Sequence, residues 1–197
     1  MKNAILIHGK PKREKFEDLS QPRPAVDHYH PWAADQFAKR GITTYMPTLP
    51  RPYDPNYEDC AAFITAFPIN PESIAVGRSM GAGLMLRIMT ERQDIFLSKL
   101  ILVAPWLDPL KNYGKLFNFQ IDPTILERVT NGVTVFYSSK DDTQALQSLG
   151  IIREAIPDAK YRDIPEYGHY MIGNTMHGEE FPELLEEVTA GLVTSKS

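Results

Sequence analysis

Short apolar segments alternate with helical segments along the chain, and this alternation constrains the fold more strongly than any single motif. The first apolar run, NAILIH at residues 3–8, is almost continuous, as a strand buried on both faces should be. Strands separated by helices of this length form parallel sheets with right-handed crossovers. The expected strands are residues 3–8, 42–46, 73–77, 99–104, 133–139 and 159–164, and the expected helices are 32–40, 56–67, 80–92, 123–129, 143–156 and 179–193. The sequence therefore predicts an α/β fold built on a parallel sheet.

Length, charge and cysteine content set limits on the class of protein. A chain of 197 residues has the usual size of one domain, so we expect a single domain over residues 1–197. The formal net charge is -4, and no cluster of Lys and Arg offsets it, which argues against nucleic acid or an anionic membrane as a partner. The N-terminal apolar run is too short for a signal peptide, and no later run reaches membrane-spanning length. Cys60 is the only cysteine, so no internal disulfide forms and a reduced, cytoplasmic setting is expected.

Polar residues follow four of the expected strands directly. In a parallel α/β sheet, ligands bind at the carboxyl ends of the strands. Side chains placed after several strands therefore meet at one edge of the sheet, and their convergence argues for a functional site better than any one motif does. In chain order these residues are His8-Gly9, Ser79, Asp141-Asp142 and Gly168-His169.

The stretch GRSMGAG, residues 77–83, fits two unrelated chemistries. Read as a glycine-rich phosphate loop, it indicates a dinucleotide-dependent dehydrogenase. That interpretation fails because the stretch follows the third expected strand and not the first. In addition, the next strand carries no acid at its tip, and no tyrosine in the chain has a lysine four positions later.

Read as G-x-S-x-G, the same stretch places Ser79 on a sharp strand-to-helix turn, with small neighbours at Gly77 and Gly81. A serine hydroxyl is a weak nucleophile and needs a base, and in this class of enzyme the order along the chain is Ser, then acid, then His. The chain supplies that order with Ser79, either of the two aspartates at 141–142, and His169. The ordered set predicts a serine hydrolase.

Six segments spread over the whole chain carry a family resemblance. They are IHG near the N-terminus, HPW at the first helix, VGRSMGAG, LILVAPW, SSKDD and YGHY. Together with the chain length, they resemble small serine hydrolases of the α/β-hydrolase superfamily typified by retinoblastoma-binding protein 9 and the bacterial YdeN-type proteins. The resemblance implies an α/β-hydrolase-like, mostly parallel sheet of about six strands with helices on both faces and a minimal lid, which the short segment 105–122 fits. It also implies that Asp142, the second aspartate, is the catalytic acid and that His169 is the base.

The triad chemistry requires further groups. Ser79 attacks an acyl carbonyl, His169 carries the proton, and Asp142 orients the imidazole. The oxyanion that forms needs preorganised donors, for which we expect the backbone N–H groups of Met80 and Lys10. Two aromatic residues, Trp106 past a strand tip and Tyr170 beside the base, are candidates for a substrate pocket.

The chain departs from the family pattern in three places. Arg78 precedes the nucleophile where histidine is common, and TQA follows the aspartate pair in place of a hydrophobic residue and proline. The segment 10–31 is long, charged and rich in proline, and long loops of this kind are either functional or disordered. These departures bear on substrate preference and leave the catalytic groups in place.

Several of these residues have a simpler structural interpretation. Ser79 can serve as a helix cap, His169 as a buried structural histidine, and Asp141 as the cap of the helix that begins at 143, which is our main interpretation of that residue. Asp108 also follows a strand and is a rival for the catalytic acid. We expect the run Asp27-His28-x-His30 to be a solvated loop and not a metal site.

The acidic side chains of residues 179–187 are expected to face solvent. The sequence thus predicts a serine hydrolase that cleaves small carboxylic esters, thioesters or amides, with no cofactor and no metal. Its expected partner is a small acyl substrate, with no protein partner indicated. The alternative is a catalytically silent hydrolase scaffold that acts as a protein-interaction module, because a fold does not determine a function.

Overall fold

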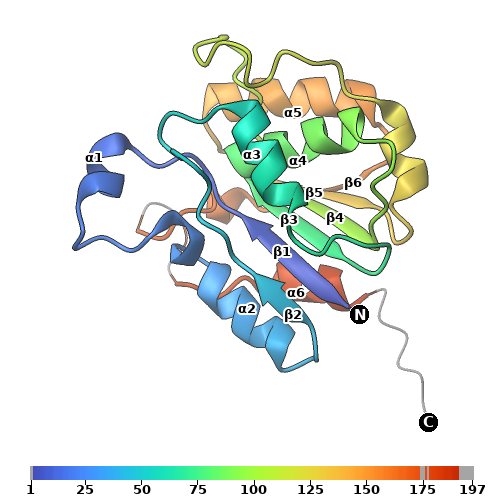
Figure 1. The fold of residues 1–197 in the computed structure, drawn as a ribbon, viewed down its shortest axis with the longest axis horizontal. Coiled ribbons are helices and arrows are strands. Elements are labelled where there is room, and N and C mark those ends of the chain that lie inside the picture. Colours follow the sequence, from blue (N-terminus) through green and yellow to red (C-terminus); the bar gives the residue numbers. More distant parts are fainter. Residues whose placement is uncertain (1, 174–175, 177, 191–197) are drawn as a thin grey trace.

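Six parallel strands form one sheet in the order β2-β1-β3-β4-β5-β6 (Figure 1). The computed structural model describes residues 2–173, 176 and 178–190. The strands are β1 (Asn3–Ile7), β2 (Thr43–Tyr45), β3 (Ile74–Arg78), β4 (Lys99–Val103), β5 (Val133–Tyr137) and β6 (Lys160–Asp163). Each of the six expected strands is therefore present, and the predicted α/β fold class is confirmed.

Helices cover both faces of the sheet (Figure 1). Apolar residues of α3, α4 and α5 pack on one face, and those of α2 and α6 pack on the other. The bounds of these helices are α2 (His30–Ala38), α3 (Tyr57–Thr65), α4 (Met80–Glu91), α5 (Thr143–Ala155) and α6 (Pro182–Thr189). Both faces of the central strands are thus buried, which explains why these strands read as continuous apolar runs and not as alternating ones.

Strand β1 illustrates how the two cores are filled. Ile5 and Ile7 enter the core under α3, α4 and α5, whereas Ala4 and Leu6 enter the core under α2 and α6. Successive side chains of a strand point to opposite faces, so one five-residue strand supplies both cores. All five of its residues are buried.

The order of the strands places a crevice between β1 and β3. From β1 the chain crosses to β2 at one edge, and it then returns to β3 on the other side of β1. The loops after β1 and β3 consequently leave the sheet in opposite directions. Ligands of open α/β sheets bind at such a switch point, outside the carboxyl ends of the strands. His8-Gly9 and Ser79 both lie there.

The long segment 10–31 is ordered into short helical pieces. It contains α1 (Arg13–Glu17) and a 3-10 turn, η1 (Pro24–Val26), before α2 begins. Residues 123–129, expected as a helix, form the 3-10 helix η2 (Pro123–Arg128), and a third such turn, η3 (Pro165–Tyr167), follows β6. The fully described segment 105–122 contains no helix or strand, in agreement with a minimal lid.

The last helix is shorter than expected. The prediction covered residues 179–193, whereas α6 runs from Pro182 to Thr189, and positions 191–193 lie outside the described residues. Among the helices that the structure describes, none has both the length and the apolar character needed to cross a bilayer.

Glu187 on α6 is buried, which corrects the expectation that all acidic residues of 179–187 face solvent. Its side chain is 2% exposed. It lies 2.5 Å from the Lys99 ammonium of β4 and 2.7 Å from that of Lys160 on β6, and it accepts a hydrogen bond of 2.9 Å from Thr134 on β5. Burial by itself raises the pKa of Glu187, but the hydrogen bonds from Lys160, Lys99 and Thr134 outweigh it and lower the pKa to about 2. One carboxylate thus fastens the last helix to three strands.

Replacing this carboxylate by a neutral amide tests its structural role. We expect Glu187→Gln to lower the free energy of unfolding by about 3 kcal/mol, because it leaves the nearly buried Lys99 without its counter-charge. Glu186→Gln is the matched control, since Glu186 is 68% exposed and should change stability by no more than about 0.5 kcal/mol. Urea unfolding measures both, and equal effects of the two substitutions would contradict the role given to Glu187.

Candidate active site

Ser79 occupies a strained turn between β3 and α4. Its backbone has φ 52° and ψ -118°, a region that residues other than glycine rarely adopt. The turn is possible only because its neighbours are small. A Cβ on Gly81 would collide with the carbonyl oxygens of Ile7 and His8, and one on Gly77 would lie 2.6 Å from the Ala82 backbone. The side chain of Ser79 is thereby presented at the carboxyl edge of the sheet.

A chain of hydrogen bonds runs from this serine through an imidazole to a carboxylate. Ser79 Oγ lies 2.9 Å from His169 Nε2, and His169 Nδ1 lies 3.0 Å from both carboxylate oxygens of Asp141. The carboxylate can only accept, so Nδ1 carries the proton and Nε2 accepts from the serine hydroxyl. The Asp141 side chain is 4% exposed, which shields this pairing from solvent.

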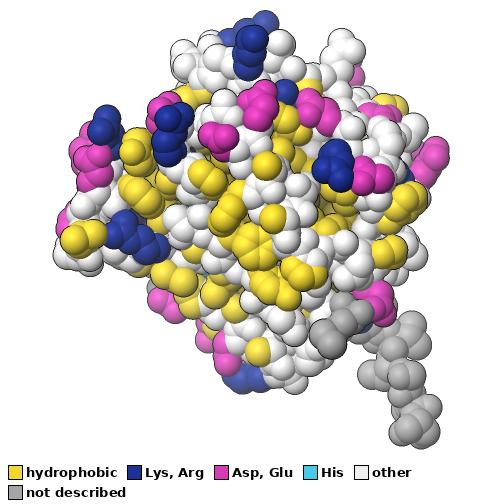
Figure 2. Space-filling view, viewed as in Figure 1, with side chains coloured by type: hydrophobic (Ala, Val, Ile, Leu, Met, Phe, Trp, Pro, Cys, Tyr) yellow, Lys and Arg dark blue, Asp and Glu magenta, His cyan; other side chains and the backbone are white. Residues whose placement is uncertain are grey.

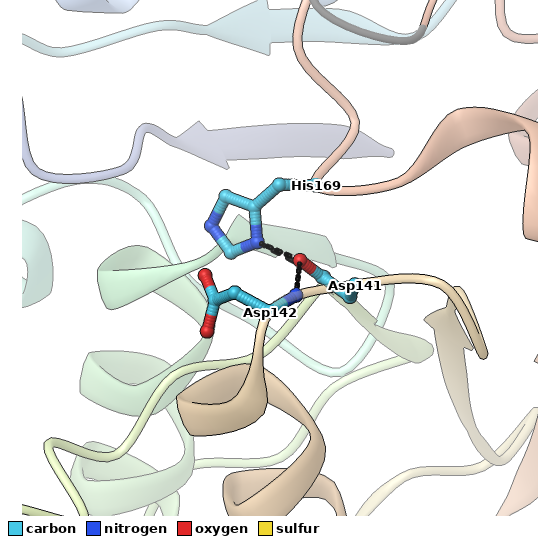
Figure 3. A group of neighbouring side chains, drawn as sticks. All are labelled: Asp141, Asp142 and His169. Atoms are coloured by element: carbon cyan, nitrogen blue, oxygen red, sulfur yellow. Dashed lines mark hydrogen bonds and ion pairs between the residues drawn. The ribbon is translucent and has the colours of Figure 1, made fainter.

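The acid in this arrangement is Asp141, so the expectation that Asp142 pairs with His169 is wrong. Figure 3 shows the imidazole joined to Asp141, with no hydrogen bond to Asp142. Asp142 is instead the N-cap of α5, where its carboxylate accepts a hydrogen bond of 2.9 Å from the Ala145 N–H. Our assignment of Asp141 as the helix cap is wrong for the same reason, because the two aspartates exchange roles.

Helix capping explains this exchange. The residue directly before the first helical residue is the one whose side chain reaches the free N–H groups of the first turn. Since α5 begins at Thr143, Asp142 holds that position, and Asp141 is left free to face the imidazole. Asp141 also accepts a hydrogen bond of 2.8 Å from the Asp142 N–H, which fixes its carboxylate. The departure of TQA from the family pattern lies at this point, because α5 begins at Thr143, where the family pattern has a hydrophobic residue followed by proline.

The same three side chains offer ligand atoms to a metal ion. Asp141, Asp142 and His169 each have a nitrogen or oxygen atom within 4.8 Å of the others (Figure 3). A metal bound to His169 Nδ1 would compete with the proton that Asp141 accepts there. The observed geometry is that of a hydrogen-bonded pair.

The two expected oxyanion donors are the backbone N–H groups of Met80, directly after Ser79, and of Lys10, in the loop after β1. Within the described residues, neither the Met80 N–H nor the Lys10 N–H takes part in a hydrogen bond. The Lys10 side chain lies over the Tyr113 ring, with the ammonium 4.6 Å from the ring centroid. The role of these two N–H groups stays a prediction.

The two aromatic pocket candidates have different outcomes. Tyr170 is 0% exposed, its hydroxyl donates to the Tyr137 carbonyl, and its ring packs against Phe181, so the expectation that it lines a substrate pocket is wrong. It is a core residue beside the base. Trp106 is partly exposed and donates to Gln144 through its ring N–H, and its role in a pocket stays a prediction.

Asp108, the rival acid, is occupied elsewhere. It is 5% exposed and accepts hydrogen bonds from the backbone N–H groups of Asn112 and Tyr113. These bonds shape the loop after β4. No hydrogen bond connects Asp108 with His169 among the residues that the structure describes.

Three histidines near Arg78 are buried, and two of them belong to residues 27–30. This corrects the expectation that residues 27–30 form a solvated loop. His8, His28 and His30 are 0%, 7% and 1% exposed. Burial, assisted by the positive charge of Arg78, lowers the pKa of His8 and His28 to about 4 and that of His30 to about 3. All three are therefore neutral at pH 7. Asp27 pairs with Lys15 at 2.6 Å, and the one possible ligand group found among the described residues does not include it.

Known structures share this arrangement of strands and helices. The structure of the ydeN gene product from B. subtilis matches with a TM-score of 0.78 at 18% identity, covering 96% of this chain and 98% of that chain. A putative yden-like hydrolase from Pectobacterium atrosepticum matches with a TM-score of 0.61 at 16% identity, covering 95% and 91%. Est1E from Butyrivibrio proteoclasticus, solved with ferulic acid bound, matches with a TM-score of 0.62 at 13% identity, covering 98% and 88%.

The chain has the α/β-hydrolase fold. The resemblance to YdeN-type proteins is thus confirmed for the fold, and the resemblance to retinoblastoma-binding protein 9 stays a prediction. No family model matches the sequence, and no curated protein matches it either.

The buried histidines predict a loss of stability in mild acid. His8 donates from Nδ1 to the Gly9 carbonyl and accepts the Leu49 N–H at Nε2, so protonation of Nε2 breaks the second bond. With a folded pKa of about 4 and an unfolded value near 6.5, the unfolded state binds more protons between these pH values, and stability falls as pH falls through this window.

Lowering the pH from 7 to 5 should decrease the unfolding free energy of the wild type and of His8→Gln. We expect the decrease to be about 2 kcal/mol smaller in His8→Gln, because this variant lacks one buried histidine that takes up a proton on unfolding. Urea unfolding of both proteins at the two pH values gives this difference. Parallel pH dependences would mean that His8 titrates alike in the folded and unfolded states.

Proposed function

We propose that this protein is a serine hydrolase that cleaves small carboxylic esters, thioesters or amides through an acyl-enzyme. The observation that carries the proposal is the continuous hydrogen-bonded chain from Ser79 through His169 to Asp141, mounted on a strained turn. This constellation activates a serine for attack on an acyl carbonyl, and it is recognised by geometry and not by position in the sequence.

The roles follow from the proton positions. Ser79 Oγ attacks the carbonyl carbon while His169 Nε2 takes the hydroxyl proton, and Asp141 stabilises the imidazolium that results. In this proposal the Met80 and Lys10 N–H groups bind the oxyanion. His169 then returns the proton to the leaving alcohol, thiol or amine. In the second half-reaction His169 activates a water, which releases the acid and restores Ser79.

The names of the structural neighbours support the proposal. They include a yden-like hydrolase from Pectobacterium atrosepticum and an esterase from Pyrococcus furiosus, the latter with a TM-score of 0.56 at 14% identity. The fold alone supports hydrolysis only by analogy, so the main support for the proposal is the hydrogen-bonded arrangement of Ser79, His169 and Asp141. The same triad disfavours a catalytically silent scaffold, which has no need of a hydrogen-bonded nucleophile. A cytoplasmic location, inferred from the lone, buried Cys60, belongs to the same proposal.

Labelling with a fluorophosphonate probe tests whether the serine is activated. We expect the wild type to be labelled stoichiometrically and Ser79→Ala to be unlabelled and inactive, because the probe forms its bond with the activated oxygen. Circular dichroism confirms that the variant is folded. Labelling that survives in Ser79→Ala would locate the nucleophile elsewhere.

The exchange of the two aspartates has its own test. We expect Asp141→Asn to lower kcat by about 10⁴-fold, since an amide holds the imidazole in the wrong tautomer. Asp142→Asn is the matched control, because asparagine caps a helix as well as aspartate does, and it should change kcat by less than about threefold. Equal losses in the two variants, measured on one activated ester, would contradict the assignment of the acid.

A further inference from the structure

Arg78, the residue directly before Ser79, is a buried cation without an ion-pair partner among the described residues. Its side chain is 7% exposed. Among the described residues, no carboxylate lies within ion-pair distance of its guanidinium, and its Nε has no hydrogen-bond partner although it is fully buried. The groups around it are the neutral histidines His8, His28 and His30 and the Tyr29 hydroxyl, which also has no partner. The Asp27 carboxylate acts on its charge only from beyond ion-pair distance and is itself bound by Lys15 at 2.6 Å.

An arrangement of this kind is unfavourable in the free protein. A charge that leaves water without a partner costs several kcal/mol, and buried arginines are ordinarily paired with carboxylates. The neutral histidines cannot supply the missing negative charge. A residue kept in place at such a cost to stability marks a functional position, and here the missing partner is an anion.

A pocket of about 470 Å³ opens beside Arg78, and this is within the range of small-molecule sites. Its walls come from the segment 10–31, with Phe16, Pro22 and Pro24 supplying apolar surface. It also touches Gly9 in the loop after β1 and Met171, two residues past the base. The pocket therefore borders the loops after β1 and β6 and the end of β3, next to Ser79 and His169, which are not themselves among its lining residues. Figure 2 shows apolar, basic and acidic side chains close together where the segment 10–31 projects.

The charges that line the pocket are mostly positive. Four of the lining residues are cationic, namely Arg78, Lys10, Lys12 and Lys15. Asp27 is the one acidic residue among them, and its carboxylate is already held by Lys15 at 2.6 Å. A pocket with this balance attracts anions. The guanidinium can hold a carboxylate through two parallel hydrogen bonds, a geometry that an ammonium group does not offer.

The guanidinium lies close to the nucleophile. A Cβ placed on Gly9 would be 2.9 Å from Arg78 Nη2 and 3.2 Å from Ser79 Cβ, so these two atoms are at most about 6 Å apart. A carbonyl attacked by Ser79 and a carboxylate held by Arg78 would thus be separated by a short spacer of no more than about three methylene groups.

We propose that the substrate is the ester, thioester or amide of a short dicarboxylic acid, whose free carboxylate binds Arg78 while Ser79 attacks the other carbonyl. This inference rests on the proposed hydrolase function and names its substrate class. The Ser79 Oγ–carbon bond forms, the bond from that carbon to the leaving group breaks, and the leaving group departs with the proton from His169. Water then cleaves the acyl-enzyme and releases the dicarboxylic acid.

Binding to the inactive Ser79→Ala protein tests the substrate class without turnover. Monoethyl glutarate and diethyl glutarate form a matched pair that differs in one negative charge. We expect isothermal titration calorimetry to show about 10- to 100-fold tighter binding of the monoester, the range contributed by a hydrogen bond to a charged group. Equal affinities for the two esters would overturn the proposal.

A second substitution locates the anion site. In Ser79→Ala/Arg78→Met the preference for the monoester should fall to about onefold, because the apolar side chain cannot hold a carboxylate. Ser79→Ala/Lys12→Gln is the control for the general positive field and should retain a preference within about threefold of that of Ser79→Ala. A preference that survives in the Arg78 variant, or that depends equally on Lys12, would contradict the role of Arg78.

Two further measurements distinguish a failure of the proposed substrate class from a failure of the proposed hydrolase function. Arg78→Met should be no less stable than the wild type in urea, since it removes an unpaired buried charge, and a destabilised variant would mean that Arg78 has a structural partner. Fluorophosphonate labelling of the wild type separates the two proposals. Labelled protein without a monoester preference refutes the substrate class alone, whereas unlabelled protein that prefers the monoester refutes the hydrolase and leaves an anion-binding pocket.

Discussion

The close approach of α4 to β1 is the constraint on which the site depends. Gly81 lies so near the carbonyl oxygens of Ile7 and His8 that no side chain fits between them. This contact holds the strained backbone of Ser79 at the edge of the sheet, within 2.9 Å of the His169 imidazole. It also brings the loop after β1, with its free N–H at Lys10, beside the serine. A turn that costs free energy is thus maintained by the packing of the whole sheet around it.

Much of the fold could be predicted from the sequence because both faces of the sheet are buried. A strand covered on both faces reads as an apolar run, and this holds for the four central strands β1, β3, β4 and β5. The edge strands β2 and β6 are partly exposed, and their β-branched and aromatic residues indicated them instead. The helix ends and the internal structure of 10–31 could not be predicted in the same way. Those features depend on tertiary contacts such as the pairing of Lys15 with Asp27, which leaves no periodic pattern in the sequence.

The residue types of the site and their order along the chain could be predicted. The choice between two adjacent residues of the same type could not. Ser79 and His169 follow from spacing, whereas the choice between Asp141 and Asp142 depends on where α5 begins. A shift of one residue in a helix start exchanges the roles of two identical side chains. The burial of individual polar side chains could not be predicted either. His28, His30 and Glu187 look like surface residues in the sequence, and all three lie inside the protein.

Glu187 has a consequence for how the protein is made. The carboxylate that neutralises Lys99 and Lys160 belongs to the last helix, so the growing polypeptide lacks it while the rest of the sheet is already available for folding. His169, which hydrogen-bonds to Ser79, also follows most of the sheet in the sequence. A nascent chain on the ribosome therefore holds an uncompensated lysine in its core, and a serine without its imidazole partner, until residues 169 and 187 have emerged. The ion pairs under the sheet and the hydrogen bonds at its carboxyl edge thus depend on the same late part of the described sequence.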